Sequence, residues 1–330
     1  MKQFVLKVLA FFAIIAVVDI AGGFGLKWLA AHAKGGFTLR DNYICDSLRT
    51  DILLSGSSRC VRHYNPQIIS DSLGVSCYNS GQMGNGIILN YGRLKMINER
   101  QKPNLVIYDL QPGFDMLVGD DNHRYLTWLK GHYDRDGIAD IFSSVDDTEQ
   151  YKMTSQLYRY NSRIIELVSD YLQPLSNAKP NGFSPLKGEI DRLKIRSNVE
   201  KPRQYRFDQL KLEYINKYIQ EVGADHIVFV VSPSWYGMDS LQFKPVKEIC
   251  EKQQIPFIDY SNNPKYVHND SYFKDGSHMN AKGADEFTKD LVQMLREKRV
   301  LRSRNEENDE IVADNVDGHR TSWLSFLRFM

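Results

Sequence analysis

Two segments far apart in the chain carry side chains that suit nucleophilic chemistry. One is Asp275-Gly-Ser-His278, which places a carboxylate three residues before an imidazole, and the other is the serine-rich turn Ser55–Ser58, directly after the apolar run Ile52–Leu54. A serine hydroxyl needs a base to take its proton, and an imidazole that titrates near neutrality suits that role. A carboxylate on the other ring nitrogen orients the imidazole. We therefore predict a triad of one of these serines, His278 and Asp275.

Each segment also has a structural interpretation. A Gly-Ser-Ser sequence after an apolar run is common in plain strand-to-loop turns. Asp275 could cap the helix expected from about Asn280, and Gly283 could simply allow that helix to pack closely. The catalytic interpretation is favoured because both segments lie at suitable ends of an alternating strand and helix pattern.

The elements that must position these side chains alternate along the chain. The expected strands are 52–54, 77–79, 105–110, 226–231 and 256–260, and the expected helices are 66–73, 87–99, 210–219, 245–252 and 284–295. Short apolar strands separated by helices predict a three-layer α/β/α domain with a parallel, flavodoxin-like sheet. Such sheets place their sites at the carboxyl ends of the strands, where both segments fall.

These residues resemble the SGNH (GDSL-type) hydrolases and acyltransferases. The turn Gly56-Ser57-Ser58 is similar to the nucleophile turn of that family, which maps the nucleophile to Ser58 and leaves Ser57 as the near alternative. Asp275 and His278 match the family's late D-x-x-H pair. The turn followed by His-Tyr-Asn-Pro is similar to the membrane-anchored branch, which includes the D-alanyl transfer and alginate O-acetylation proteins.

The resemblance also implies an oxyanion hole. The segment Asn79–Gly84 resembles the family's second block, whose last glycine donates a backbone N–H, so Gly84 and the N–H of Ser58 are the expected donors. The third block of the family supplies an asparagine that this chain lacks after the strand 105–110. Gln111 is the nearest amide and is the expected substitute. Losing one such donor typically costs about 2.7–4 kcal/mol of transition-state stabilisation.

The N-terminus predicts a membrane anchor. Val8–Leu26 is apolar or small apart from Asp19, and 19 residues are about the length that crosses a hydrocarbon core as a helix. Lys2 and Lys7 before it favour a cytoplasmic N-terminus and a catalytic body outside the cytoplasm, in the periplasm or extracellular space. A signal peptide cleaved near Ala31-His32-Ala33 is the main alternative.

Composition limits the other classes of function. The 330 residues are 42% hydrophobic and 25% charged with a formal net charge of +1, which gives no electrostatic basis for binding nucleic acid. No cofactor and no metal are predicted, because five histidines lack Cys or carboxylate partners at a metal-ligand spacing. They are His63, His123, His132, His226 and His268. The four cysteines form no paired framework and are expected to be buried free thiols.

The domain organisation and function follow. We expect an anchor or signal at 1–27, a linker at 28–45, an SGNH-like domain at 46–298 with a helical insertion at about 116–207, and a polar tail at 299–330 with an apolar end. The resemblance implies an esterase or O-acyltransferase acting on O-acyl groups, above all O-acetyl groups, of envelope or extracellular polysaccharide, with envelope proteins as further partners. The alternative is an inactive SGNH-fold module that binds carbohydrate or assists assembly, as the missing asparagine suggests.

Overall fold

A five-stranded parallel sheet forms the centre of the protein. The structure is a computed structural model that describes residues 1–119, 122–172, 181–192 and 204–297. The strand order is β2-β1-β3-β4-β5, the flavodoxin-like order, which confirms the predicted fold class. The strands are β1 (Ile52–Gly56), β2 (Cys77–Asn79), β3 (Leu105–Asp109), β4 (Ile227–Val231) and β5 (Phe257–Asp259).

Helices cover both faces of the sheet, because successive side chains of each strand enter different cores. Leu53 and Val106 belong to the core beneath α5, α10 and α11. Their neighbours Leu54 and Ile107 belong to the core beneath α3, α4 and α12. The covering helices are α3 (Ser58–His63), α4 (Pro66–Leu73), α5 (Ile87–Asn98), α10 (Gln209–Val222), α11 (Lys244–Gln253) and α12 (Ala281–Glu297). These layers make the α/β/α arrangement.

The segment 28–45, expected as a linker, is mostly helical instead. α1 (Lys2–Ala31) continues past the apolar stretch, and α2 (Gly36–Asp46) begins after a short turn. α2 forms because it buries Ile44 and Cys45 in the core beside α5.

The chain between β3 and α10 contains helices and no strand among the residues that the structure describes. They are α6 (Pro112–Asp115), η1 (Asn122–Leu126), η2 (Lys130–His132), α7 (Ile138–Val145), α8 (Glu149–Lys152) and α9 (Ile164–Leu172). The helical character expected of the insertion is thus divided among short helices joined by turns. Three short helices complete the described elements: η4 (Ala224–His226), η5 (Ser240–Phe243) and η6 (Asp270–Tyr272). The predicted tail, 299–330, lies outside the described residues.

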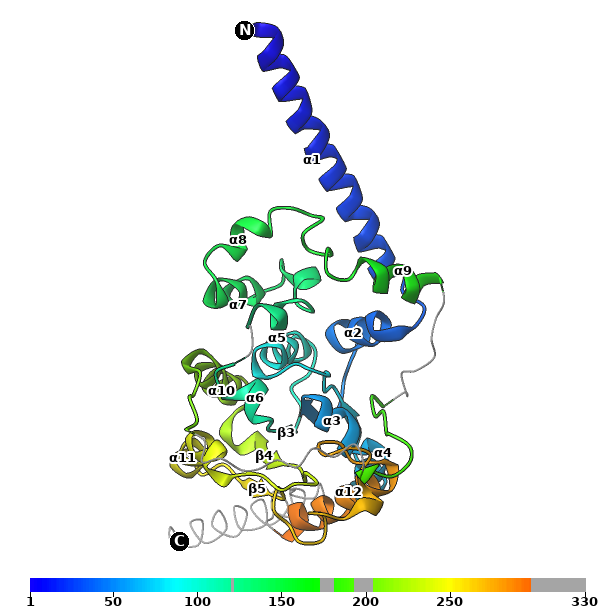
Figure 1. Ribbon diagram of the computed structural model, residues 1–330, viewed down its shortest axis with the longest axis vertical. Coiled ribbons are helices and arrows are strands. Elements are labelled where there is room, and N and C mark those ends of the chain that lie inside the picture. The colour runs from blue at the N-terminus through cyan, green and yellow to red at the C-terminus, as the bar shows by residue number, and fades with distance from the viewer. Residues whose placement is uncertain (120–121, 173–180, 193–203, 298–330) are drawn as a thin grey trace, which may run out of the picture.

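The helix α1 projects from the body, and α8, α9 and the turns between them lie at the end of the body from which it emerges (Figure 1). Within the described part of the chain, α1 is the one helix that is long and apolar enough to cross a membrane. Its apolar side chains from Phe4 to Val18 are exposed. The N-terminal helix can therefore serve as a membrane anchor.

Candidate active site

Ser58, His278 and Asp275 form a continuous hydrogen-bonded chain. The Nε2 atom of His278 lies 2.9 Å from Oγ of Ser58, across 220 residues of sequence. Its Nδ1 atom lies 3.0 Å from Oδ2 and 3.1 Å from Oδ1 of Asp275. A proton on Nδ1, held by the carboxylate, leaves Nε2 free to accept the Ser58 proton. The fold thus gives the three side chains the order that nucleophilic catalysis requires.

The end of β1 presents Ser58 at the carboxyl edge of the sheet. Gly56 has a φ of 146°, and a Cβ there would lie 2.7 Å from the carbonyl oxygen of Asp109, so the turn requires glycine. Ser58 then begins α3, where a first-turn N–H has no partner inside the helix. Ser57, the alternative nucleophile, is fully buried, and its hydroxyl has no hydrogen-bond partner among the described residues. The geometry therefore favours Ser58.

Asp275 belongs to a tight turn that closes on itself. Its Oδ1 accepts the backbone N–H groups of Ser277 and His278, each at 2.8 Å. Partial burial would raise its pKa, but the hydrogen bond from His278 and these N–H groups outweigh burial and lower the pKa to about 2. The carboxylate is thus ionised at neutral pH and aimed at His278. Asp275 therefore caps its turn and binds the imidazole of His278 at the same time.

His63 connects the two halves of the site from within the core. Its Nε2 accepts the N–H of Met279 at 3.0 Å, and its Nδ1 lies 3.0 Å from Oγ of Ser232. Burial lowers the pKa of His63 well below its usual value, so the ring stays neutral. The residue after His278 is thereby held to α3, the helix that begins with Ser58. This His63 contact between distant segments has no signature in the local sequence.

Two buried arginines hold the loop that follows β2. Nη2 of Arg40 donates to the carbonyl oxygens of Asn79 and Gly81 at 2.9 and 2.8 Å. Nη1 of Arg93 donates to the carbonyl oxygen of Ser80 at 3.1 Å. The two arginines thus donate hydrogen bonds to three successive carbonyl groups. These bonds fix the path of the loop that leads to Gly84.

Gly84, at the end of this loop, has a φ of 67°, which glycine adopts without strain. The structure records no hydrogen bond from the N–H of Gly84 to any other described residue. An N–H in this state can serve an incoming ligand. Ser58 and Gly84 both follow the carboxyl ends of strands, β1 and β2, which are neighbours in the sheet.

Gln111 follows the carboxyl end of β3, the other neighbour of β1. Its backbone N–H donates to Oδ2 of Asp115 at 2.7 Å, which shapes the turn into α6. Burial raises the pKa of Asp115 to about 7. The Oε1 atom of Gln111 is buried and has no partner within the described residues. Gln111 thus lies at the carboxyl edge of the sheet, the edge that carries Ser58.

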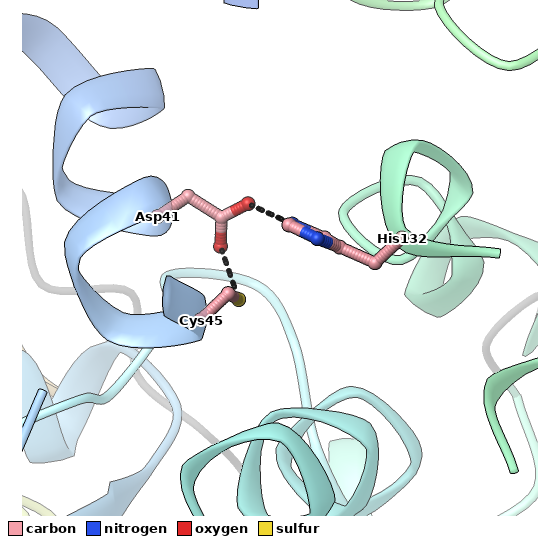
Figure 2. Close-up of side chains that lie close together, drawn as sticks. All are labelled: Asp41, Cys45 and His132. Atoms are coloured by element: carbon pink, nitrogen blue, oxygen red, sulfur yellow. Dashed lines mark hydrogen bonds and ion pairs between the residues drawn. The ribbon is translucent and has the colours of Figure 1, made fainter. Parts of the chain in front are cut away.

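A second group of chemically similar side chains lies between α2 and η2. Asp41 and Cys45 come from α2, and the ring of His132 faces the Asp41 carboxylate (Figure 2). Nε2 of His132 lies 3.6 Å and Sγ of Cys45 lies 3.8 Å from the two oxygens of Asp41. From sequence spacing alone, no Cys or carboxylate partner of His132 was expected.

The Asp41 cluster does not fit a cation. Nη2 of Arg93 lies 2.6 Å from Asp41 and Nη1 of Arg163 lies 3.9 Å away, so arginines already neutralise the carboxylate. Burial would raise the pKa of Asp41, but Arg93 and His132 hold it well below its usual range. Burial would lower the pKa of His132, but Cys45 and Asp41 raise it to about 10, so the imidazole is protonated. A protonated imidazole is not a metal ligand.

A third group, made of one histidine and two acidic side chains, is His123, Asp146 and Glu149, around α8. Lys152 already bonds to this group, with Nζ 2.8 Å from Oε1 of Glu149.

The cysteines are all free and buried, as expected from their spacing. Burial raises the pKa of Cys60 well above its usual value, so this thiol near Ser58 stays protonated.

Comparison with known proteins gives distant structural likeness and no match in sequence. No family model matches the chain, and no curated protein matches it. Among solved structures the chain is similar to a lipase/acylhydrolase from Enterococcus faecalis, with 13% identity and a TM-score of 0.39 over 77% of this chain and 97% of that chain. At that distance the function has to be inferred from the geometry of the site.

Proposed function

We propose that the protein is a serine esterase or O-acyltransferase of the SGNH type, with Ser58 as nucleophile, His278 as general base and acid, and Asp275 as its orienting carboxylate. The observation that carries the proposal is the chain of contacts from Ser58 Oγ through both ring nitrogens of His278 to Asp275. Such an order of atoms on partly exposed side chains matches what acyl transfer requires.

The reaction proceeds in two halves. Oγ of Ser58 attacks the ester carbonyl carbon while Nε2 of His278 takes the serine proton, which gives a tetrahedral oxyanion. The N–H groups of Ser58 and Gly84 stabilise that oxyanion, and the Gln111 carboxamide is the third donor in place of the family's asparagine. His278 then protonates the leaving alcohol, and the acyl group remains on Ser58.

The second half regenerates the serine. His278 deprotonates the acceptor, whose oxygen attacks the acyl carbon and releases Ser58 with its proton restored. A water acceptor gives a carboxylic acid and makes the protein an esterase. A sugar hydroxyl gives a new ester and makes it a transferase.

The substrate we propose is an O-acylated, above all O-acetylated, polysaccharide of the envelope or extracellular space, in line with the membrane-anchored branch of the family. The apolar helix α1 supports anchorage, and Lys2 and Lys7 ahead of it support a body outside the cytoplasm. An anchored enzyme of this kind works on polymers and partners held at the same surface.

Active-site labelling tests this proposal. The full-length protein in detergent is treated with a fluorophosphonate and the adduct is mapped by mass spectrometry, while hydrolysis of a short aryl acetate is followed. We expect a label on Ser58 that Ser58→Ala abolishes, with activity falling by about 10³-fold or more.

Ser57→Ala is the matched control, because it removes the adjacent, buried hydroxyl and should keep both label and activity. Absence of any label in the folded protein would overturn the enzyme proposal in favour of a binding module, which would instead retain acylated glycan in a pulldown. Comparing water with an added sugar acceptor then separates esterase from transferase.

A further inference from the structure

The anchor helix is clamped to the body along its last turns. Within α1, the carboxylate of Asp19 accepts the hydroxyl of Ser155 at 2.5 Å and the N–H groups of Gln156 and Leu157 at 2.9 and 3.1 Å. A Cβ on Gly23 would lie 2.2 Å from Cβ of Gln156, so the helix and this turn touch where only glycine fits. Asp19, the one charged residue of the apolar stretch Val8–Leu26, thus binds the turn at 155–157.

The base of α1 is also joined to α9. The N–H of Lys34 donates to the carbonyl oxygen of Asp170 at 3.0 Å, and the N–H of Thr38 donates to its carboxylate at 2.9 Å. The rings of Trp28 and Tyr171 lie 5.3 Å apart. The orientation of α9 relative to the anchor is therefore set by direct contacts on both sides of the connection to α2.

The outer face of α9 is apolar, and none of the described residues covers it. Ile165 is 87% exposed and Leu172 is 66% exposed, and Val168 lies between them at helical spacing. The opposite face of the helix carries Leu167, which is buried. The one acidic group near the exposed face, Glu166, is paired with Arg163 at 2.8 Å. An amphipathic helix with such a face is typical of segments that lie in a membrane interface.

The length of α1 indicates what covers this face. The charge-free stretch ahead of Asp19, Val8–Val18, rises only about 16 Å as a helix, whereas a hydrocarbon core is about 30 Å thick. The whole of Val8–Leu26 rises about 28 Å and does match that thickness. A bilayer that α1 spans therefore reaches the turns clamped against the body, where the hydrogen bonds from Ser155, Gln156 and Leu157 satisfy the Asp19 carboxylate. Lys27 and Trp28, next along the helix, are the residue types found at the headgroup level.

We propose that the body is seated in the bilayer through a collar, defined as Phe24 of α1 and Ile164, Ile165, Val168 and Leu172 of α9, whose side chains enter the boundary between headgroups and acyl chains. Phe24 is 66% exposed on α1, and α1 packs against α9. In Figure 1, α9 lies across the end of α1. The inference rests on the anchoring role of α1 and is independent of the chemistry at Ser58.

The collar has a mechanical consequence for the proposed enzyme. A span joined to the body by a flexible linker would let the body rotate freely above the membrane. A collar together with the Asp19 clamp holds it in one orientation, so the site on the carboxyl edge of the sheet keeps a constant height and direction relative to the membrane. Substrates held at the same surface would then meet Ser58 in a limited set of poses.

Depth-dependent fluorescence quenching tests the collar. The full-length protein is reconstituted into phosphatidylcholine and phosphatidylglycerol vesicles with an environment-sensitive dye on Ile165→Cys, and lipids with a spin label near the top of the acyl chain serve as quenchers. The native cysteines are buried and stay unlabelled. We expect blue-shifted emission at position 165 and loss of most of that emission with the quenching lipid.

Two further positions make the result decisive. Lys252→Cys lies on exposed α11, far from α1 in Figure 1, and should remain unquenched. Phe12→Cys in α1 reports insertion of the anchor itself. A quenched position 12 with an unquenched, water-like position 165 would overturn the collar while leaving the anchor intact, and an unquenched position 12 would overturn both.

Replacing the exposed apolar side chains of α9 provides a second measurement. Ile165→Glu with Leu172→Glu should abolish quenching of a dye on Val168→Cys while the aryl acetate activity stays unchanged, because neither residue belongs to the site. If the chain's own 298–330 segment or a second copy covers the face, the Ile165→Cys signal will be insensitive to quenching lipid and will change on truncation of that segment or on dilution. Either result would contradict the collar.

Discussion

Two clusters of this protein contain the same chemical types in different order. At the edge of the sheet the imidazole of His278 lies between the hydroxyl of Ser58 and the carboxylate of Asp275. In the cluster of Figure 2 the carboxylate of Asp41 lies in the middle, between a thiol and an imidazole. Only the first order lets a base take a proton from a nucleophile while a carboxylate supports its other nitrogen.

The two clusters also differ in access to solvent and in charge. The side chain of His278 is 27% exposed, whereas Cys45 is completely buried. The buried carboxylate is surrounded by Arg93 and Arg163, which makes the cluster a packed ion-pair centre. The comparison teaches that residue types alone do not define a catalytic site: the order of contacts and the access of substrate decide.

Replacing the exposed carboxylate of the triad should have the largest effect. Asp275→Asn keeps the size of the side chain but cannot hold His278 in the required tautomer, so we expect kcat to fall about 10⁴-fold. The amide oxygen can still accept the N–H groups of Ser277 and His278, so the fold should survive, with a melting temperature lowered by the loss of the carboxylate charge. Ester hydrolysis and thermal unfolding are measured on the same detergent sample. Retention of full activity would reduce Asp275 to a cap of its turn.

The buried cluster should respond in the opposite way. Arg93→Met leaves the Asp41 carboxylate without its closest partner and frees the Ser80 carbonyl, so we expect a stability loss of about 3–5 kcal/mol. Lys244→Met, which breaks the exposed pair with Glu248, is the control and should leave the melting temperature unchanged. Equal melting temperatures for the two variants would show that the cluster does not stabilise the fold.

The same contrast explains what could be predicted from the sequence. The parallel sheet was predictable because its strands are buried on both faces and therefore form apolar runs. The pairing of Asp275 with His278 was predictable because both lie in one turn, and the link to Ser58 followed from the family resemblance.

The parts that escaped prediction depend on long-range contacts. Arg93 binds Asp41 across 52 residues, and neither residue lies in a local sequence pattern that predicts the pair. The helix α2 was expected as a linker because its stability comes from packing against α5 and α9 rather than from its own apolar periodicity. The role of Asp19 depends on a turn more than a hundred residues away.

The smallest effect, and the sharpest test of the Asp275 assignment, lies in the pH dependence. Its pKa of about 2 is lower than the value of about 4 of an unfolded aspartate. The stabilisation that its ionised form provides is thus fully present above about pH 5 and is lost as the pH falls toward 2. Between about pH 5 and 8 the carboxylate has constant charge.

Below about pH 5 the free energy of unfolding of the wild type should consequently fall more steeply than that of Asp275→Asn, which has no carboxylate to protonate at this position. The two stabilities should converge as the pH approaches 2, where the wild-type carboxylate takes up its proton and becomes comparable to the neutral amide. Urea unfolding of the two proteins between about pH 5 and 2 measures this. Parallel profiles of stability against pH would mean that the pKa of Asp275 is not lowered, and that the hydrogen bonds of its turn do not hold it ionised as the geometry requires.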